Sequence, residues 1–208
     1  MRRWLLPLIS VFLLAAPARA EPLRIIAYGD SLTAGYGLPA DDAFPARLQA
    51  ALRARGHDVE IVNAGVSGDT ASAGLARLDW TLAEPADGAI LELGANDALR
   101  GIDPEETGKS LDQILAAFKA RGMAVLIAGM AAPRNLGHAY VEAFDAIYPN
   151  LASKYGALLY PFFLDGVVGD TRLNQADGIH PTAEGVGIIV ERMLPAVEEL
   201  IARIKSHT

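Results

Sequence analysis

Two widely separated segments carry residue types that together could perform nucleophilic chemistry. Gly29-Asp30-Ser31 places a hydroxyl in a short turn, and Asp177 stands three residues before His180. A serine hydroxyl becomes an effective nucleophile only when a base removes its proton and a third group holds that base in one tautomer. The sequence therefore predicts Ser31 as the nucleophile, His180 as the base and Asp177 as the carboxylate that orients the base.

Attack of a hydroxyl on an acyl carbon creates an oxyanion, which requires hydrogen-bond donors fixed in advance. We expect these donors to be the backbone N–H of Ser31, the backbone N–H of Gly65 and the side-chain amide of Asn96. Gly65 has no side chain, so its amide can approach a substrate closely. Taken singly, such serines, asparagines and glycines are more often turn formers. Only their combination points to catalysis.

Five short apolar runs predict the strands that would position these residues. They cover residues 23–28, 59–63, 89–93, 124–129 and 157–160, and amphipathic helical patterns occupy residues 41–55, 70–82, 104–121, 139–154 and 182–204. Residues typical of helix ends mark these limits, namely Asp103 with Pro104 at a start and Gly56 and Gly122 after two ends. Continuous apolar strands alternating with helices indicate a parallel sheet covered on both faces. We expect a three-layer α/β/α fold, flavodoxin-like, with strand order 2-1-3-4-5.

In an open parallel sheet, ligands bind beyond the carboxyl ends of the strands. Apolar residues near that edge are predicted to bind an acyl chain, namely Leu32, Met130, Pro133, Leu136 and Ile179. Phe162 and Phe163 follow the fifth strand, where paired aromatic residues are more typical of a core, so we exclude them from the predicted site. His138 is interpreted as a solvated loop residue.

The sequence blocks around these residues resemble those of the SGNH hydrolases, also called the GDSL family. Ser31 matches the serine of the first block, Gly65 the glycine of the second and Asn96 the asparagine of the third, while Asp177 and His180 match the Asp-x-x-His of the last. Residues 67–78, 91–97, 143–149 and 161–163 resemble one branch in particular. That branch comprises periplasmic thioesterase I, protease I or lysophospholipase L1 and the bacterial arylesterases.

The resemblance implies hydrolysis of acyl esters and thioesters, including aryl esters, acyl-CoA and lysophospholipids. It implies a Ser–His–Asp triad, a three-part oxyanion hole, and neither a metal nor a cofactor. Residues 133–140 depart from the branch's usual pattern, with Leu136 in place of an aromatic residue.

The first 20 residues have the pattern of a secretory signal peptide. Two arginines open the chain, residues 4–16 are apolar, and Ala18-Arg19-Ala20 offers a cleavage site before Glu21. We therefore expect residues 1–20 to be removed, residues 21–208 to form a single domain, and the protein to be periplasmic or secreted. A retained N-terminal anchor is the alternative.

Charge and cysteine content exclude several partners and chemistries. Without the three arginines of the leader, 15 basic residues face 25 acidic ones, a formal net charge of −10. Such a surface repels phosphate backbones and anionic membranes, so we expect no nucleic acid partner. We also expect no stable membrane insertion after cleavage, and a monomer. The absence of cysteine excludes a thiol nucleophile.

Two alternative functions remain open from the residues alone. The first is a carbohydrate or peptidoglycan O-deacetylase, which would prefer acetyl esters to longer ones. The second is a periplasmic lipid-binding module without catalysis. The sequence lacks G-x-G-x-x-G after the first strand, a Walker pattern and the G-x-S-x-G nucleophile elbow, so nucleotide binding and the ordinary α/β-hydrolase fold are disfavoured.

Overall fold

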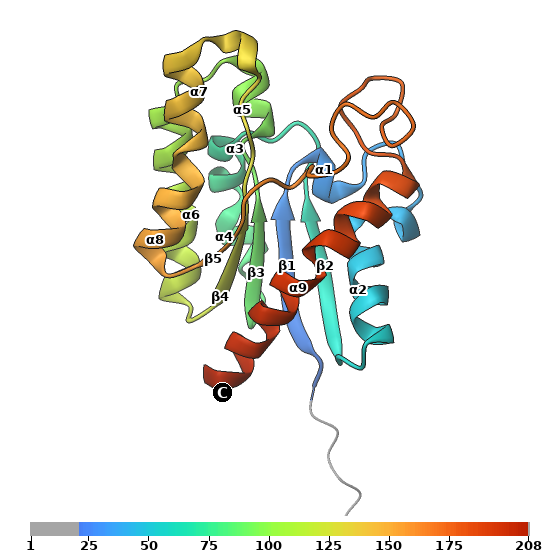
Figure 1. Ribbon diagram of the computed structural model, residues 1–208. Coiled ribbons are helices and arrows are strands. Elements are labelled where there is room, and N and C mark those ends of the chain that lie inside the picture. Colours follow the sequence, from blue (N-terminus) through green and yellow to red (C-terminus); the bar gives the residue numbers. More distant parts are fainter. Residues whose placement is uncertain (1–20, 208) are drawn as a thin grey trace, which may run out of the picture.

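The five apolar runs form one parallel sheet in the computed structural model, which describes residues 21–207. The strands are β1 (Leu23–Gly29), β2 (Val59–Gly65), β3 (Gly88–Glu92), β4 (Ala124–Ala128) and β5 (Leu158–Tyr160). Their spatial order is β2-β1-β3-β4-β5, and every pairing is parallel. Figure 1 shows the strands running in one direction with helices on both sides. The predicted three-layer fold and strand order are confirmed.

The strand order places the end of β1 at the point where the chain changes direction across the sheet. The chain leaves β1 for β2 on one side and later returns to β3 on the other. Gly29, the last residue of β1, is in register with Gly65 of β2 and with Glu92 of β3. Because ligands bind at such a switch point in open α/β sheets, the residues that follow Gly29 lie where a site is expected.

Two layers of helices cover the sheet. The longer helices are α2 (Phe44–Ala54), α6 (Pro104–Ala120), α7 (His138–Asp145), α8 (Ile147–Tyr155) and α9 (Ala183–His207), and the shorter ones are α1 (Ser31–Ala34), η1 (Ala40–Asp42), α3 (Ala71–Ala76), α4 (Leu78–Thr81), α5 (Ala95–Arg100) and η2 (Arg134–Leu136). Helices α2 and α9 pack together on one face, while α3, α4 and α6 lie on the other (Figure 1). Helix α8 contacts α6 and β5.

The helix-end residues lie where they were expected. Asp103 caps α6 by accepting from the Glu105 N–H, Pro104 opens that helix, and Gly56 and Gly122 have positive φ angles after α2 and α6. Two predicted helices are each divided in two. Residues 139–154 form α7 and α8, because Pro149 has no N–H to continue a helix and instead sits in the first turn of α8. Residues 70–82 form α3 and α4, which meet at Arg77.

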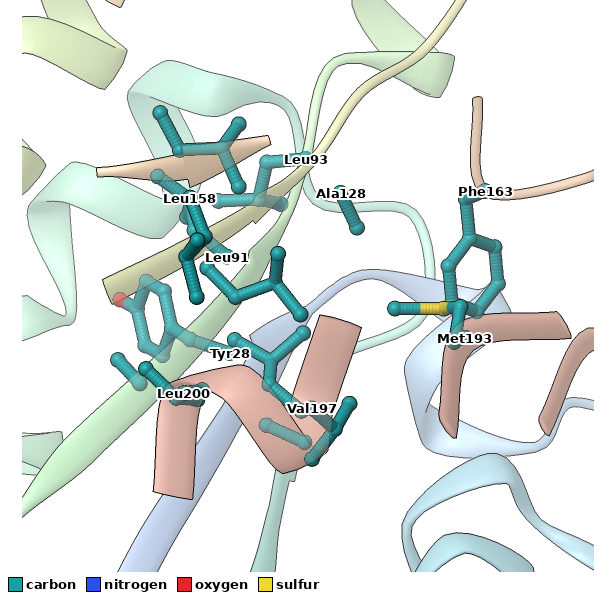
Figure 2. Packing of buried hydrophobic residues seen from close by; sticks show 14 of the residues in the cluster. Tyr28, Leu91, Leu93, Ala128, Leu158, Phe163, Met193, Val197 and Leu200 are labelled. Carbon is teal, nitrogen blue, oxygen red and sulfur yellow. The ribbon is translucent and has the colours of Figure 1, made fainter. Parts of the chain in front are cut away.

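The core is continuous from the sheet to α9. Figure 2 shows part of this core, with Val197 and Leu200 of α9 on one face of the sheet. Tyr28 lies on the other face, where its ring contacts Phe118 of α6 and its hydroxyl donates to the Gly74 carbonyl. Met193, Val197 and Leu200 are fully buried and follow the helical spacing of three and four residues. Each such side chain stabilises the fold by about 1.5–3 kcal/mol. The sheet is therefore a rigid platform for the loops at its carboxyl edge.

The predicted signal peptide, residues 1–20, lies outside the described residues. Within residues 21–207, no helix has both the length and the apolar character that crossing a bilayer requires.

Candidate active site

Ser31 is the first residue of α1, immediately beyond the carboxyl end of β1. The side chain of Asp30 caps this helix, since its Oδ1 accepts from the Leu32 N–H at 2.9 Å. Among the described residues no acceptor takes the Ser31 backbone N–H, as is usual at the first position of a helix. The turn therefore presents both a hydroxyl and a free backbone donor on the same residue.

The loop before α9 brings His180 and Asp177 to this hydroxyl. The Nε2 atom of His180 lies 2.8 Å from Ser31 Oγ, and its Nδ1 atom lies 2.7 Å from Asp177 Oδ2. A carboxylate accepts, so Nδ1 carries the proton and Nε2 is the lone-pair nitrogen that faces the serine. Residues 149 positions apart in the sequence thus form one continuous hydrogen-bonded chain.

Asp177 is held as an anion by its own turn. Its Oδ1 accepts from the backbone N–H groups of His180 at 3.0 Å and Ile179 at 2.9 Å. These bonds, with the contact to the imidazole, lower the pKa of Asp177 to about 2. The carboxylate is therefore ionised throughout the pH range in which proteins normally work, and it keeps the imidazole in one orientation.

His180 is also fixed from its other sides. The Tyr36 ring lies against the imidazole, with centroids 4.5 Å apart. The backbone N–H of Gln175 donates to the His180 carbonyl at 2.7 Å, and the Gln175 side-chain amide donates to the carbonyls of Tyr36 and Pro181. Gln175 therefore ties the histidine loop to the segment after α1.

Asn96 lies in α5, with its side chain directed to the turn after β1. Its amide nitrogen donates to Asp30 Oδ2 at 3.1 Å and to the Asp69 carbonyl at 3.0 Å. Asp69 is in turn held by Arg77, whose guanidinium donates to the Asp69 carboxylate at 2.6 Å and to the Gly29 carbonyl at 2.9 Å. The amide is thus rigidly placed, and an oxyanion would share or displace its contact with Asp30.

The structure does not bring Gly65, predicted to supply an oxyanion donor, to the cavity beside Ser31. Gly65 is part of β2, its N–H donates to the Asn63 side chain at 3.0 Å, and it is not among the residues that line the cavity beside Ser31. Gly68, three residues further along, does line that cavity. Its N–H has no acceptor among the described residues, and its φ of +87° is one that glycine adopts readily.

A cavity of about 700 Å³ opens beside Ser31 and His180, with mostly apolar walls. Of the predicted acyl-binding residues, Leu32, Met130, Pro133 and Ile179 line it, whereas Leu136 does not. Phe162 lines the cavity although it was excluded, while Phe163 is fully buried in the core as expected. Ala131, in the apolar loop after β4, lines the cavity as well, and further lining residues that the sequence did not reveal include Tyr36, Leu99, Leu164 and Val168.

His138 lies outside the cavity lining, and its imidazole is largely exposed beside Glu142. Across residues 21–207, no group of three or more histidine, aspartate or glutamate side chains is arranged to hold a metal ion. Besides Ser31 and His180, the titratable residues that line the cavity are Tyr36 and Arg134.

A three-layer α/β fold that aligns a serine, a histidine and an aspartate at the carboxyl edge of its sheet has the architecture of a serine hydrolase. The chain belongs to the GDSL-like lipase/acylhydrolase family, whose pattern matches residues 27–188. It is therefore a hydrolase.

Relatives of known structure or name match nearly the whole chain. The crystal structure of AlinE4, an SGNH-hydrolase family esterase, is 46% identical with a TM-score of 0.74, covering 88% of this chain and 98% of that one. Esterase TesA of Pseudomonas aeruginosa is 38% identical over 194 residues, 93% of this chain and 96% of that protein. Thioesterase 1/protease 1/lysophospholipase L1 of Escherichia coli K12 is 40% identical over 200 residues, 96% of this chain and 94% of that protein.

Proposed function

We propose that the protein hydrolyses acyl esters and thioesters by two-step acyl transfer, with Ser31 as nucleophile, His180 as general base and Asp177 as the orienting carboxylate. The observation that carries this proposal is the continuous chain from Asp177 Oδ2 through the imidazole to Ser31 Oγ, with contacts of 2.7 and 2.8 Å. Relatives named esterase, thioesterase and lysophospholipase support the substrate class.

In the first step the Ser31 hydroxyl proton passes to His180 Nε2 as Oγ bonds to the acyl carbon. The imidazolium formed is stabilised by the Asp177 carboxylate, and it then donates the proton to the leaving alcohol or thiol. In the second step the imidazole takes a proton from water as the water oxygen bonds to the acyl carbon, and it returns a proton to Ser31 Oγ as the C–Oγ bond breaks and the acid is released. Each step uses the same lone pair on Nε2.

The oxyanion formed in each step would be stabilised by donors already at the cavity wall. We assign this role to the backbone N–H groups of Ser31 and Gly68, both without an acceptor in residues 21–207, and to the Asn96 amide. Ser31, Gly68 and Asn96 all line the same cavity. Such fixed donors stabilise charge without reorganisation at the moment of reaction.

The cavity favours acyl groups longer than acetyl. Its volume of about 700 Å³ and its apolar walls would reward each added methylene that they bury with about 0.8 kcal/mol. This property separates the proposal from an O-deacetylase, which gains nothing from such a cavity.

We also propose that residues 1–20 are a signal peptide and that residues 21–208 act as a single exported domain, periplasmic or secreted. The basic start, apolar stretch and Ala-x-Ala site support it. The mature protein is proposed to be a monomer, to bind small acyl substrates and to have no nucleic acid partner. An exported product whose N-terminus is Glu21 is the expected outcome of mass analysis.

Covalent labelling tests the proposal most directly. A fluorophosphonate should add to the purified protein in a 1:1 ratio, the adduct should map to Ser31, and Ser31→Ala should abolish both the adduct and turnover. A panel of nitrophenyl esters from acetyl to dodecanoyl, with acyl-CoA and lysophospholipid, should show a preference for chains beyond acetyl. Absence of an adduct would favour the lipid-binding module, and a preference for acetyl esters would favour the deacetylase.

A further inference from the structure

Two carboxyl groups, those of Asp30 and Glu92, lie behind the Ser31 turn without solvent exposure and outside the cavity lining. Oε2 of Glu92 accepts from the Thr33 hydroxyl at 2.7 Å and from the Asp30 backbone N–H at 3.3 Å. Oε1 of Glu92 is buried and has no hydrogen-bond partner. Glu92 has no role in the proposed acyl transfer, yet its side chain supports the segment that carries the nucleophile.

The sequence makes room for this side chain at one particular position. Glu92 is in register with Gly29 of β1. A Cβ atom at Gly29 would lie 2.6 Å from the Glu92 backbone carbonyl oxygen and 2.6 Å from Oε2, closer than real Cβ contacts. Glycine at position 29 therefore lets the Glu92 carboxyl pass beneath the turn and reach Thr33.

The two carboxyl groups have different hydrogen-bond environments. Both oxygens of Asp30 accept, Oδ1 from the Leu32 N–H and Oδ2 from the Asn96 amide, which suits an anion. Glu92 has both of its donors on one oxygen and none on the other, which suits a carboxylic acid whose proton is on Oε1. Two adjacent carboxylates without solvent exposure would repel each other strongly.

We propose that Glu92 is a positioning residue that works as an uncharged acid, holding the Asp30–Thr33 turn through Oε2 while the single negative charge of the pair stays on Asp30. The charge on Asp30 orients the Asn96 amide. A second charge on Glu92 would oppose the oxyanion that develops at Ser31, because Coulomb repulsion is weakly screened in a buried site. This last step rests on the proposed function, whereas the charge state of Glu92 does not.

The surrounding groups agree with this division of charge. Burial, and secondarily the Asp30 charge, raise the pKa of Glu92 well above its usual value, while the Thr33 hydroxyl partly offsets the rise. Burial raises the pKa of Asp30 to about 6, and the nearby Asp69 adds to this rise. The hydrogen bonds from Leu32 and Asn96 and the electrostatic effect of His180 lower the same pKa and offset part of the rise. From α8, the buried Tyr148 phenol donates to the Leu93 carbonyl, and its own pKa is raised by burial and by nearby carboxylates that include Glu92.

Infrared spectroscopy of the whole mature protein tests the charge state without any assay of activity. At neutral pH the wild-type protein should show the C=O stretch of a buried protonated carboxyl group. That band should be absent from Glu92→Gln and retained in Asp30→Asn. A wild-type spectrum without the band, or a Glu92→Gln spectrum that keeps all of it, would overturn the proposal. Because the wild-type spectrum alone is informative, misfolding of one variant leaves the test intact.

The positioning role is tested by kinetics on folded Glu92→Gln, which keeps an oxygen to accept from Thr33. The kcat/KM of Glu92→Gln at neutral pH should stay within about threefold of the wild-type value. A threefold change corresponds to less than half of the change in activation free energy that a tenfold change in rate requires. Wild-type kcat should fall at alkaline pH as Glu92 ionises, and the Glu92→Gln variant should lack that fall. In the Thr33→Val variant the fall in kcat should occur at a higher pH. A loss of more than about tenfold at neutral pH, or identical pH profiles, would overturn the role. Fluorophosphonate labelling of Ser31 reports separately on the proposed function.

Discussion

The imidazole of His180 lies against the phenol ring of Tyr36, with ring centroids 4.5 Å apart and planes inclined by 37°. Asp177 and Ser31 fix the two ring nitrogens, and neither of them restrains tilting of the imidazole out of its plane. The ring of Tyr36, a residue that is 53% exposed, supplies that restraint from the cavity side. The base is therefore held by hydrogen bonds at its edge and by a ring contact on its face.

Removing this ring should weaken catalysis moderately. An aromatic pair contributes about 0.5–1.5 kcal/mol beyond burial, so Tyr36→Ala should lower kcat by roughly twofold to tenfold. Tyr36→Phe, the matched control, keeps the ring and should lose less. Rates measured with a nitrophenyl ester at saturation decide this. Equal losses in the two variants would show that the hydroxyl, and not the ring contact, matters.

Replacing Asp177 should damage turnover much more than Tyr36. Asp177→Asn keeps the shape but can donate to Nδ1, which leaves the proton on Nε2 and removes the base, and comparable substitutions cost about 10⁴ in kcat. Because the pKa of Asp177 is lowered to about 2, its contact with His180 is present above the ordinary value of 3.8 and is lost only as pH falls through about 2. Loss of activity in mild acid should therefore not come from protonation of Asp177. A pH–rate profile whose acid limb follows protonation of Asp177 would contradict this assignment.

Replacing Asn96 should lower kcat far more than it changes KM. One oxyanion donor is worth about 10²–10³ in kcat, and Asn96→Ala should lose that much while it still forms the fluorophosphonate adduct slowly. Asn96→Ala also frees Asp30 Oδ2 and the Asp69 carbonyl, so its fold must be checked by circular dichroism. A folded Asn96→Ala variant with unchanged kcat would remove Asn96 from the proposed oxyanion hole.

The sheet could be predicted because its strands are continuous apolar runs separated by amphipathic helices. Helices α1 and α5 were not predicted, since segments of four and six residues are too short to show helical periodicity. Ser31 and Asn96 could be singled out because each follows a strand that ends at the same edge of the sheet, and His180 because Asp177 stands three residues before it. Their roles remain predictions, although the structure brings Ser31, Asn96 and His180 to one cavity.

The choice between Gly65 and Gly68 could not be made from the sequence. Both glycines lie in one polar stretch after the predicted second strand. Only the pairing of Gly65 with Gly29 shows that β2 extends far enough to include Gly65. The sequence could not show that Phe162 lines the cavity and Leu136 does not, because the direction of a loop side chain depends on backbone angles that no periodicity encodes. Glu92 was not singled out, because the sequence does not reveal the empty space that Gly29 provides.

Glu92→Gln should stabilise the protein, and increasingly so at higher pH. The pKa of Glu92 is raised above its unfolded value of 4.5, so folding opposes its ionisation, and the folded state loses stability as pH rises above 4.5. Glutamine removes that penalty, which grows by on the order of 1 kcal/mol per pH unit. Tm measured at pH 4 and pH 7 should show a larger gain at pH 7. Exposed Glu191→Gln is the matched control, and an equal gain there would contradict the expectation.

Chain-length preference should follow the free volume of the cavity. Ala131 lines the cavity and Leu136, in the same loop, does not. Ala131→Phe should therefore shorten the acyl chain that fits, and kcat/KM for octanoyl and decanoyl esters should fall by roughly fourfold for each methylene excluded, the equivalent of about 0.8 kcal/mol. The acetyl ester, which does not reach that wall, should be hydrolysed as before. Leu136→Phe adds a comparable ring outside the lining and should leave the preference unchanged. A shift in Leu136→Phe equal to that in Ala131→Phe would mean that the acyl chain lies elsewhere.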